Sequence, residues 1–186
     1  EAVQAHNVMG CAKHFALNSI EETRMKVDVR VDERTLREVY LPQFERLARA
    51  DVASFMSAYN KVNGDYSGES RRLLREILKE EWGYRGFVMS DFFRGVYDGR
   101  KAALAGLDLE MPWTEAYGKA LVAAVEKGDV PVAVIDEAVL RLLRRKIEYG
   151  TRPDPIAYPA TLVRAEEHLA LAREVAEKGV VLLKNE

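Results

Sequence analysis

The 186-residue chain lacks several features whose absence narrows what it can be. Its single cysteine, Cys11, cannot form a disulfide within the chain, and the apolar run around it predicts a buried thiol. The formal net charge is only −2, so the sequence predicts no basic surface for nucleic acid or anionic lipid. No stretch approaches the roughly 20 consecutive apolar residues that a membrane span requires. These absences favour a globular protein with neither a nucleic-acid nor a membrane partner.

Three motifs of cofactor and metal proteins are also missing from the sequence. There is no GxGxxG after an apolar strand, no GxxxxGK[ST] loop and no HExxH pair. The three histidines, His6, His14 and His168, show no ligand spacing with each other or with Cys11. We therefore expect no bound metal and no cofactor.

The composition is that of an ordinary globular domain, with 48% apolar and 31% charged residues. The chain opens on EAVQAHNVMG without an initiator methionine, and it closes on the strand-like run GVVLLKNE. Both ends favour a piece of a longer protein. The compartment stays open between cytoplasm and secretion, with the single cysteine favouring the cytoplasm.

Apolar strand-like runs alternate with helical patterns along the chain. Asp32 is a plausible cap for the first long helix, and Pro42 either kinks that helix or marks its true start. Strands are expected over 8–15, 51–60, 86–91 and 107–112. Helices are expected over 32–50, 73–82, 102–105, 117–126, 135–149 and 162–178, and a proline-rich loop over 152–159.

The order of these elements predicts βαβ units and an α/β fold with parallel strands. The strands are too apolar to expose a whole face, as in a sheet covered by helices. Parallel strands with right-handed crossovers form either an open doubly wound sheet or a closed barrel. The missing phosphate-binding motifs count against the nucleotide-binding open sheets.

Polar side chains follow the expected strands at the point where each strand ends. In parallel sheets and barrels the carboxyl ends of the strands meet at one edge, where active sites are built. Four strands that share this pattern argue more strongly than any one residue. The residues are Lys13, His14, Tyr59, Asn60, Asp91 and Glu110.

Each of these residues also has a structural interpretation. Asp91 could cap a following helix, because aspartate is a favoured N-cap. Glu110 could hold a turn through backbone hydrogen bonds, and we expect this role for it. His14 alone could be a structural histidine, and Lys13 an ordinary surface lysine. The functional interpretation depends on these residues sharing one edge of the sheet.

Five motifs, in order, resemble glycoside hydrolase family 3, in its β-glucosidase branch. They are AKHFALNS, ETR, SFMSAYNKVNG, WGYRGFVMSDF and AGLDLEMP. The resemblance implies that residues 1–150 are the C-terminal half of a (β/α)8 TIM-like barrel. It further implies that residues 151–186 are a linker helix and the first strand of a second α/β domain that is not present.

The same resemblance implies a retaining glycoside hydrolase that releases terminal β-linked glucose through a covalent glycosyl–aspartate intermediate. Asp91 would be the nucleophile, and a carbohydrate would be the partner. The acid/base is usually a glutamate of the second domain in such enzymes, which would place it beyond Glu186. The substrate-binding residues implied are Lys13, His14, Arg24, Met56, Tyr59 and Phe92.

One departure from the family pattern bears on which sugar is bound. Many relatives have tryptophan directly after the nucleophile, where this chain has Phe92, so preference for glucose over related sugars is in doubt. A β-xylosidase or another exo-glycosidase of the same family stays open. Phe93 is expected in the core.

Two alternatives come from different classes of function. Lys13 could form a Schiff base with a carbonyl substrate, as aldolases do. The chain could instead be a non-catalytic fragment that needs the missing barrel half and C-terminal domain of the same protein, or that assembles into a homo-oligomer, because half a barrel exposes sheet edges.

Overall fold

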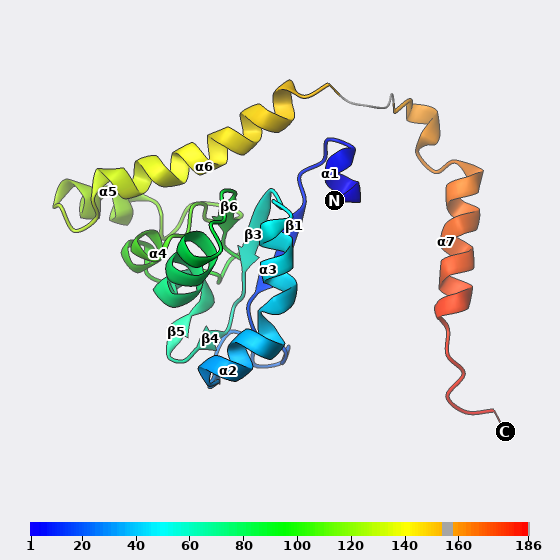
Figure 1. Cartoon of the computed structure of the whole chain (residues 1–186), viewed down its shortest axis with the longest axis horizontal. Coiled ribbons are helices and arrows are strands. Elements are labelled where there is room, and N and C mark those ends of the chain that lie inside the picture. Colours follow the sequence, from blue (N-terminus) through cyan, green and yellow to red (C-terminus); the bar gives the residue numbers. More distant parts are fainter. Residues whose placement is uncertain (154–157, 186) are drawn as a thin grey trace. The chain divides into compact units, whose positions relative to one another are not determined.

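The computed structural model describes residues 1–153 and 158–185 and divides the chain into two compact units, Glu1–Pro153 and Asp154–Glu186 (Figure 1). The second unit holds the short turn η4 (Ala160–Leu162) and the helix α7 (Glu166–Gly179). Residues 180–185 form no strand, because none of the described residues pairs with them. Part of the expected loop over 152–159 lies outside the described residues.

A parallel three-stranded sheet organises the first unit. Its strands lie in the order β1 (Cys11–Phe15), β3 (Ser54–Ser57) and β6 (Phe87–Met89). The expected fourth strand reduces to one bridge, between Met89 and Leu109. The α/β fold with parallel strands is thus confirmed.

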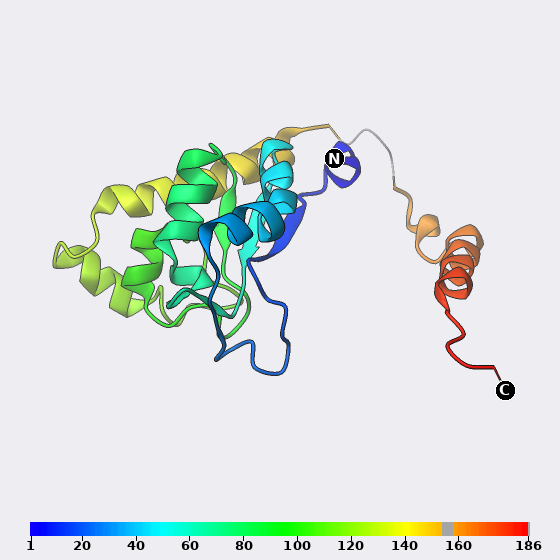
Figure 2. The same ribbon diagram turned by 60° about the horizontal axis from the view of Figure 1, so that its bottom comes forward.

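One face of this sheet forms the main core. Ala12, Phe55 and Val88 stand side by side in the register and join the same hydrophobic cluster. The helices α3 (Pro42–Arg49) and η3 (Arg72–Glu81) contribute to this cluster and lie beside the sheet (Figures 1 and 2). The ring of Phe15 meets those of Phe44 and Phe55 edge to face, with centroids 5.2 and 5.4 Å apart.

The opposite face of the sheet carries the row Cys11–Ser54–Phe87. Cys11 is exposed, so the expectation of a buried thiol was wrong. The apolar run around Cys11 indicated a strand correctly, but the side chain belongs to the outermost strand, on the face away from the core cluster.

Helix starts and ends follow local sequence signals. The Oδ1 atom of Asp32 accepts a hydrogen bond from the amide of Thr35 at 2.9 Å, which caps α2 (Glu33–Thr35). A π-helical turn, η1 (Leu36–Tyr40), follows, and Pro42 occupies the first turn of α3. Pro42 therefore marks the true start of that helix. Gly83, with φ +66°, follows the end of η3 in a conformation that favours glycine.

No helix among the described residues is long and apolar enough to span a membrane.

The first unit contains further helices and a second, smaller sheet. The helices are α1 (Ala2–Ala5), η2 (Ser67–Glu69), α4 (Gly99–Ala105), α5 (Lys119–Glu126) and α6 (Val132–Thr151). A small second sheet joins β2 (Asp28–Val29), β4 (Lys61–Val62) and β5 (Asp65–Tyr66).

A buried ion pair ties η3 to β6. The ammonium of Lys79 lies 2.7 Å from Oδ1 of Asp108, and both side chains are 2% exposed. The second carboxylate oxygen of Asp108 accepts a hydrogen bond from the amide of Val88 at 2.8 Å. Burial lowers the pKa of Lys79 and raises that of Asp108, while the charge of each partner opposes the other's shift.

Candidate active site

The carboxyl ends of the three parallel strands bring together residues that are distant in the sequence. His14 lies near the end of β1, Tyr59 follows β3 and Asp91 follows β6. These ends share one edge of the sheet because the strands are parallel. The expected clustering at this edge is therefore present for these three residues.

Asp91 is held at this edge with one carboxylate oxygen hydrogen-bonded and the other without a hydrogen bond among the described residues. Its side chain is largely buried, and Oδ1 accepts a hydrogen bond from the amide of Phe92 at 2.8 Å. Oδ2 is buried without a hydrogen bond among the described residues, 3.4 Å from Nε2 of His14. A buried carboxylate oxygen without a hydrogen bond is rare in proteins and needs an explanation.

The alternative that Asp91 caps a helix is wrong. The next helix, α4, begins eight residues later at Gly99. Its cap is Asp98, whose Oδ1 accepts a hydrogen bond from the amide of Lys101 at 3.0 Å. Asp91 is thus free of this structural role.

The turn that follows Asp91 is tightly packed. Gly95 folds back so closely that a Cβ there would overlap the backbone of Asp91. Gly68, in η2, is equally close, because a Cβ there would overlap the carbonyl oxygen of Gly95. Phe93 adopts φ +65°, a left-handed conformation that aromatic residues rarely take. Packing therefore holds this turn in a strained conformation, a feature that clusters at functional sites.

Tyr59, two residues after the end of β3, supports this turn. Its hydroxyl donates a hydrogen bond to the carbonyl of Phe92 at 2.6 Å. Burial raises the pKa of Tyr59, and the negative charge of Asp91 raises it further. Because the ordinary value is already 10.0, the hydroxyl stays protonated, and able to donate, at neutral pH.

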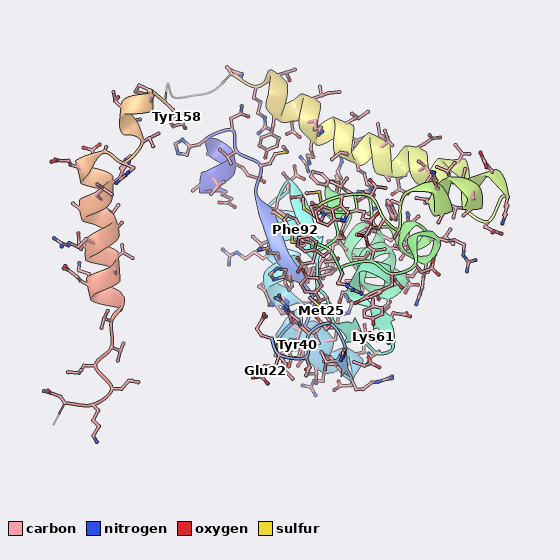
Figure 3. The ribbon with its side chains drawn as sticks, turned by 180° about the vertical axis from the view of Figure 1, so that it is seen from behind. Glu22, Met25, Tyr40, Lys61, Phe92 and Tyr158 are labelled. Atoms are coloured by element: carbon pink, nitrogen blue, oxygen red, sulfur yellow. The ribbon has the colours of Figure 1, made fainter. Side chains whose placement is uncertain are left out.

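Arg24 reaches the same place from the loop between β1 and β2. Its guanidinium lies 4.8 Å from the centre of the Tyr59 ring, in a cation–π contact. The carboxylate of Glu21 orients Arg24 from 2.8 Å. Figure 3 labels Phe92 and also Met25, which follows Arg24 in this loop.

Two further residues expected at the site, Met56 and Lys13, form neither a hydrogen bond nor an ion pair with Asp91 in the part of the chain that the structure describes. Met56 is buried in β3, opposite Met89, two residues before Asp91. Lys13 lies where the pairing of β1 and β3 is irregular, and it is exposed. An exposed lysine lacks the desolvation that activates a Schiff-base amine, so the structure gives that alternative no support.

Glu110 has the structural role expected from the sequence. Its carboxylate accepts hydrogen bonds from the amides of Glu115, Ala116 and Tyr117, at 2.8 to 3.0 Å. It thereby fixes the loop that carries Trp113, and hydrogen bonds from three amides favour its ionised form, which cannot donate a proton as a catalytic acid.

Three exposed aromatic rings form a connected group that begins at Phe92, directly after Asp91. Phe92, Phe93 and Trp113 are 38%, 55% and 54% exposed. Phe93 meets Phe92 and Trp113 edge to face, with centroids 6.2 and 4.9 Å apart. The expectation that Phe93 belongs to the core was therefore wrong, because the strained turn directs its ring outward. Trp113 was missed, although its position just after the last expected strand could have indicated it.

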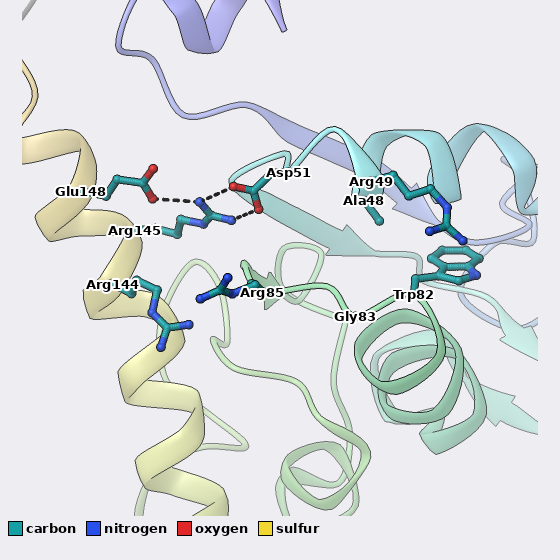
Figure 4. Close-up of a pocket in the computed structure, with 9 residues that line it drawn as sticks. All are labelled: Ala48, Arg49, Asp51, Trp82, Gly83, Arg85, Arg144, Arg145 and Glu148. Carbon is teal, nitrogen blue, oxygen red and sulfur yellow. Dashed lines mark hydrogen bonds and ion pairs between the residues drawn. The ribbon is translucent and has the colours of Figure 1, made fainter.

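A separate cavity of about 560 Å³ lies at the other edge of the sheet, before β3 and β6 (Figure 4). Its central contact is structural. The buried guanidinium of Arg145 binds both carboxylate oxygens of Asp51 and, at 2.8 Å, the carboxylate of Glu148. This network attaches α6 to the turn before β3. The lining residues are Ala48, Arg49, Asp51, Trp82, Gly83, Arg85, Arg144, Arg145 and Glu148.

Metal ligation has no visible basis at either edge. In the part of the chain that the structure describes, no three or more histidine, cysteine or carboxylate side chains converge on one point.

Comparison with known proteins assigns the chain to a family. The family model described as the glycosyl hydrolase family 3 N terminal domain matches residues 1–145. The chain belongs to glycosyl hydrolase family 3. It is 43% identical over 190 residues to a beta-glucosidase of Rhizobium radiobacter, and 42% identical over 190 residues to thermostable beta-glucosidase B of Acetivibrio thermocellus.

Solved structures of family members match over nearly the whole chain. DesR, a beta-glucosidase from Streptomyces venezuelae in complex with D-glucose, matches 99% of the chain with a TM-score of 0.84 and 37% identity. Beta-glucosidase 3B from Thermotoga neapolitana, in complex with alpha-D-glucose, matches 99% with a TM-score of 0.82 and 36% identity.

The chain spans only about a quarter of the length of these relatives. It covers 23% of the Rhizobium protein, 24% of the Acetivibrio protein, 25% of DesR and 27% of the Thermotoga enzyme. The match therefore concerns one part of a longer relative in each case.

Proposed function

We propose that this chain is part of a longer retaining β-glucosidase in which Asp91 is the nucleophile. The observation that carries the proposal is the Asp91 carboxylate at the carboxyl end of β6, with Oδ2 buried without a hydrogen bond among the described residues and 3.4 Å from Nε2 of His14. The beta-glucosidase relatives support the substrate class. Attack by this carboxylate on the anomeric carbon forms a covalent glycosyl–enzyme, which water then hydrolyses.

The neighbouring residues have distinct roles in this mechanism. His14, Lys13 and Arg24 donate hydrogen bonds to the sugar hydroxyls, and a nearby cation also favours the ionised, nucleophilic form of Asp91. Tyr59 holds the turn after Asp91 in place. Met56 lines the pocket beneath the sugar, and Phe92 lies against its C–H face.

The acid that protonates the leaving oxygen comes from outside these residues. A retaining enzyme needs a second carboxyl group about 5–5.5 Å from the nucleophile. Glu110 is occupied by three backbone amides. We propose that the second domain of the longer protein supplies the acid, and that residues 1–150 are half of a closed barrel. Among the described residues, β1 is an edge strand of the sheet, and its residue Cys11 is exposed. Both observations support a further strand and its helices packing against this edge in the longer protein.

Covalent trapping tests the proposal on the longer protein. A 2-deoxy-2-fluoro β-glucoside with a good leaving group slows hydrolysis of the intermediate, so the label accumulates on the nucleophile. We expect peptide mass spectrometry to place the label on Asp91, at one label per chain. A label on any other residue, or no label in an enzyme that is inactivated, contradicts the assignment.

Tyr59→Phe tests the positioning role of the tyrosine. The change leaves the carbonyl of Phe92 without its donor, and a hydrogen bond of about 1–1.5 kcal/mol corresponds to roughly a tenfold loss in kcat/KM. The fluoro-sugar should still label Asp91, more slowly by a similar factor. Because the pKa of Tyr59 is raised above 10, the pH–rate profile around neutrality should keep its shape. A changed acidic or basic limb would instead indicate that Tyr59 transfers a proton.

A further inference from the structure

Glu69 is a buried carboxylate that has no role in the mechanism proposed above. The residue is 4% exposed and lies at the end of η2, which follows the small second sheet. Its Oε1 atom accepts two backbone hydrogen bonds, from the amide of Tyr97 at 2.7 Å and from the amide of Asp98 at 2.9 Å. Hydrogen bonds to a carboxylate are stronger than those to a neutral acceptor. Glu69 therefore holds the end of the turn that starts at Asp91 and leads to α4.

Gly68, directly before Glu69, holds the middle of the same turn. A Cβ on Gly68 would overlap the carbonyl oxygen of Gly95, and a Cβ on Gly95 would overlap the backbone of Asp91. The two contacts thus join backbone to backbone, with no flexible side chain between η2 and Asp91. In an interior packed this closely, a shift of η2 is passed on to the turn.

η2 is itself attached to the carboxyl ends of the other two strands through Asn60, one of the polar residues expected at this edge of the sheet. The carbonyl of Asn60 accepts hydrogen bonds from the amide of Ser67 at 3.0 Å and from the hydroxyl of Ser67 at 2.9 Å. The side-chain amide of Asn60 donates to the carbonyl of Ala16, directly after β1, at 3.1 Å. η2 therefore joins the segments that follow β1, β3 and β6.

The turn needs such support because its backbone is strained. Phe93 has φ +65°, and a strained conformation persists only where the surrounding structure holds it. Among the described residues, two side chains from other elements form hydrogen bonds with the backbone of residues 92–98: Tyr59 near the start and Glu69 at the end. A misplacement of about 1 Å at a reacting group can lower an enzymatic rate roughly a hundredfold. Loss of either support should therefore act on the rate.

We propose that Glu69 is a positioning residue for Asp91: it holds the turn in the conformation that aims the carboxylate at the anomeric carbon. The proposal rests on the proposed function. Both hydrogen bonds of Glu69 go to backbone amides, so it acts on the shape of the turn and neither contacts the sugar nor transfers a proton. The cations proposed to bind the sugar, His14 and Arg24 among them, belong to β1 and the loop after it. A change at Glu69 should consequently lower kcat and leave KM nearly unaltered.

The test compares Glu69→Ala and Glu69→Gln with the unchanged longer protein on an aryl β-glucoside. Loss of two charge-assisted hydrogen bonds lets the turn move, so we expect Glu69→Ala to lower kcat roughly 10- to 100-fold while KM changes less than about threefold. Glu69→Gln keeps an acceptor oxygen at the same reach and should recover most of the loss. The fluoro-sugar should still label Asp91, more slowly by a factor similar to the fall in kcat.

A merely structural role predicts a different pattern. If Glu69 only stabilised the fold, fewer molecules would be folded, but each folded site would keep its kcat. Active sites are therefore counted by complete fluoro-sugar labelling, and kcat is expressed per labelled site. Glu80→Ala, at an exposed glutamate of η3, is the matched control and should leave kcat and KM unaltered.

A kcat per labelled site in Glu69→Ala equal to that of the control overturns the positioning role, as does a rise in KM alone. If the alanine variant gives no labelled sites, Glu69→Asp decides, because it keeps the charge on a side chain one methylene shorter. We expect kcat per labelled site to fall in Glu69→Asp at an unaltered KM, and an unaltered kcat there overturns the proposal. A label outside Asp91 in the unchanged protein would refute the proposed function instead, so the two failures are distinguishable.

Discussion

Asp91→Asn in the longer protein should lower kcat/KM for an aryl β-glucoside on the order of 10⁴-fold or more, because removal of a covalent nucleophile typically has an effect of this size. The amide has nearly the shape of the carboxylate and keeps an acceptor for the amide of Phe92, so the turn after β6 is preserved. Steady-state rates and the fluoro-sugar label together measure the effect. The label should disappear along with the activity.

Asp91→Gly adds a chemical rescue to this experiment. The glycine leaves space beside His14, and a small anion such as azide can attack the anomeric carbon from that side. We expect azide to restore turnover and to yield a glycosyl azide of inverted configuration. Asp136→Asn, at an exposed carboxylate of α6, is the matched control and should retain activity. Activity in Asp91→Asn close to that of the control would exclude Asp91 as nucleophile.

Lys79→Met should destabilise the first unit by about 3–5 kcal/mol, because it leaves the carboxylate of Asp108 buried without its partner. The methionine fills the space of the lysine stem, so little of the loss comes from packing. Native-state hydrogen exchange at the amides of β6 measures the change locally, even within a larger protein. The amide of Val88 is the most direct reporter, since it donates to Asp108.

A double variant separates charge from packing at this pair. Lys79→Met combined with Asp108→Asn removes both charges and keeps an acceptor for Val88. We expect it to recover roughly half of the stability lost in Lys79→Met, since neutralising both members of a buried pair is less harmful than removing one. A double variant no more stable than the single one would show that the pair contributes through packing alone.

Much of the fold followed from local patterns in the sequence. The cap at Asp32, the helix start at Pro42 and the parallel α/β arrangement all appear in the structure. The helices agree with their expected positions to within a few residues at most boundaries. The strands were expected too long, because the apolar runs continue beyond the residues that pair with a neighbour.

The wrong predictions concern the burial of individual side chains rather than the positions of helices and strands. Cys11 was expected to be buried and is exposed, because its burial depends on which face of the sheet a helix covers. Phe93 was expected in the core and is exposed, because one positive φ angle turns its ring outward. The pattern of apolar residues could not predict the exposure of Cys11 or of Phe93, since hydrophobicity alone does not determine which way a side chain points.

By itself, the sequence determined the family, the alternation of strands and helices, and the polar residues that end the strands, because each depends on residues close together in the chain. Only the tertiary structure decided that His14 faces Asp91, that Tyr59 holds the carbonyl of Phe92, and that Lys79 neutralises Asp108. These contacts join residues far apart in sequence. They depend on strand register and helix packing, which no local pattern of residues fixes.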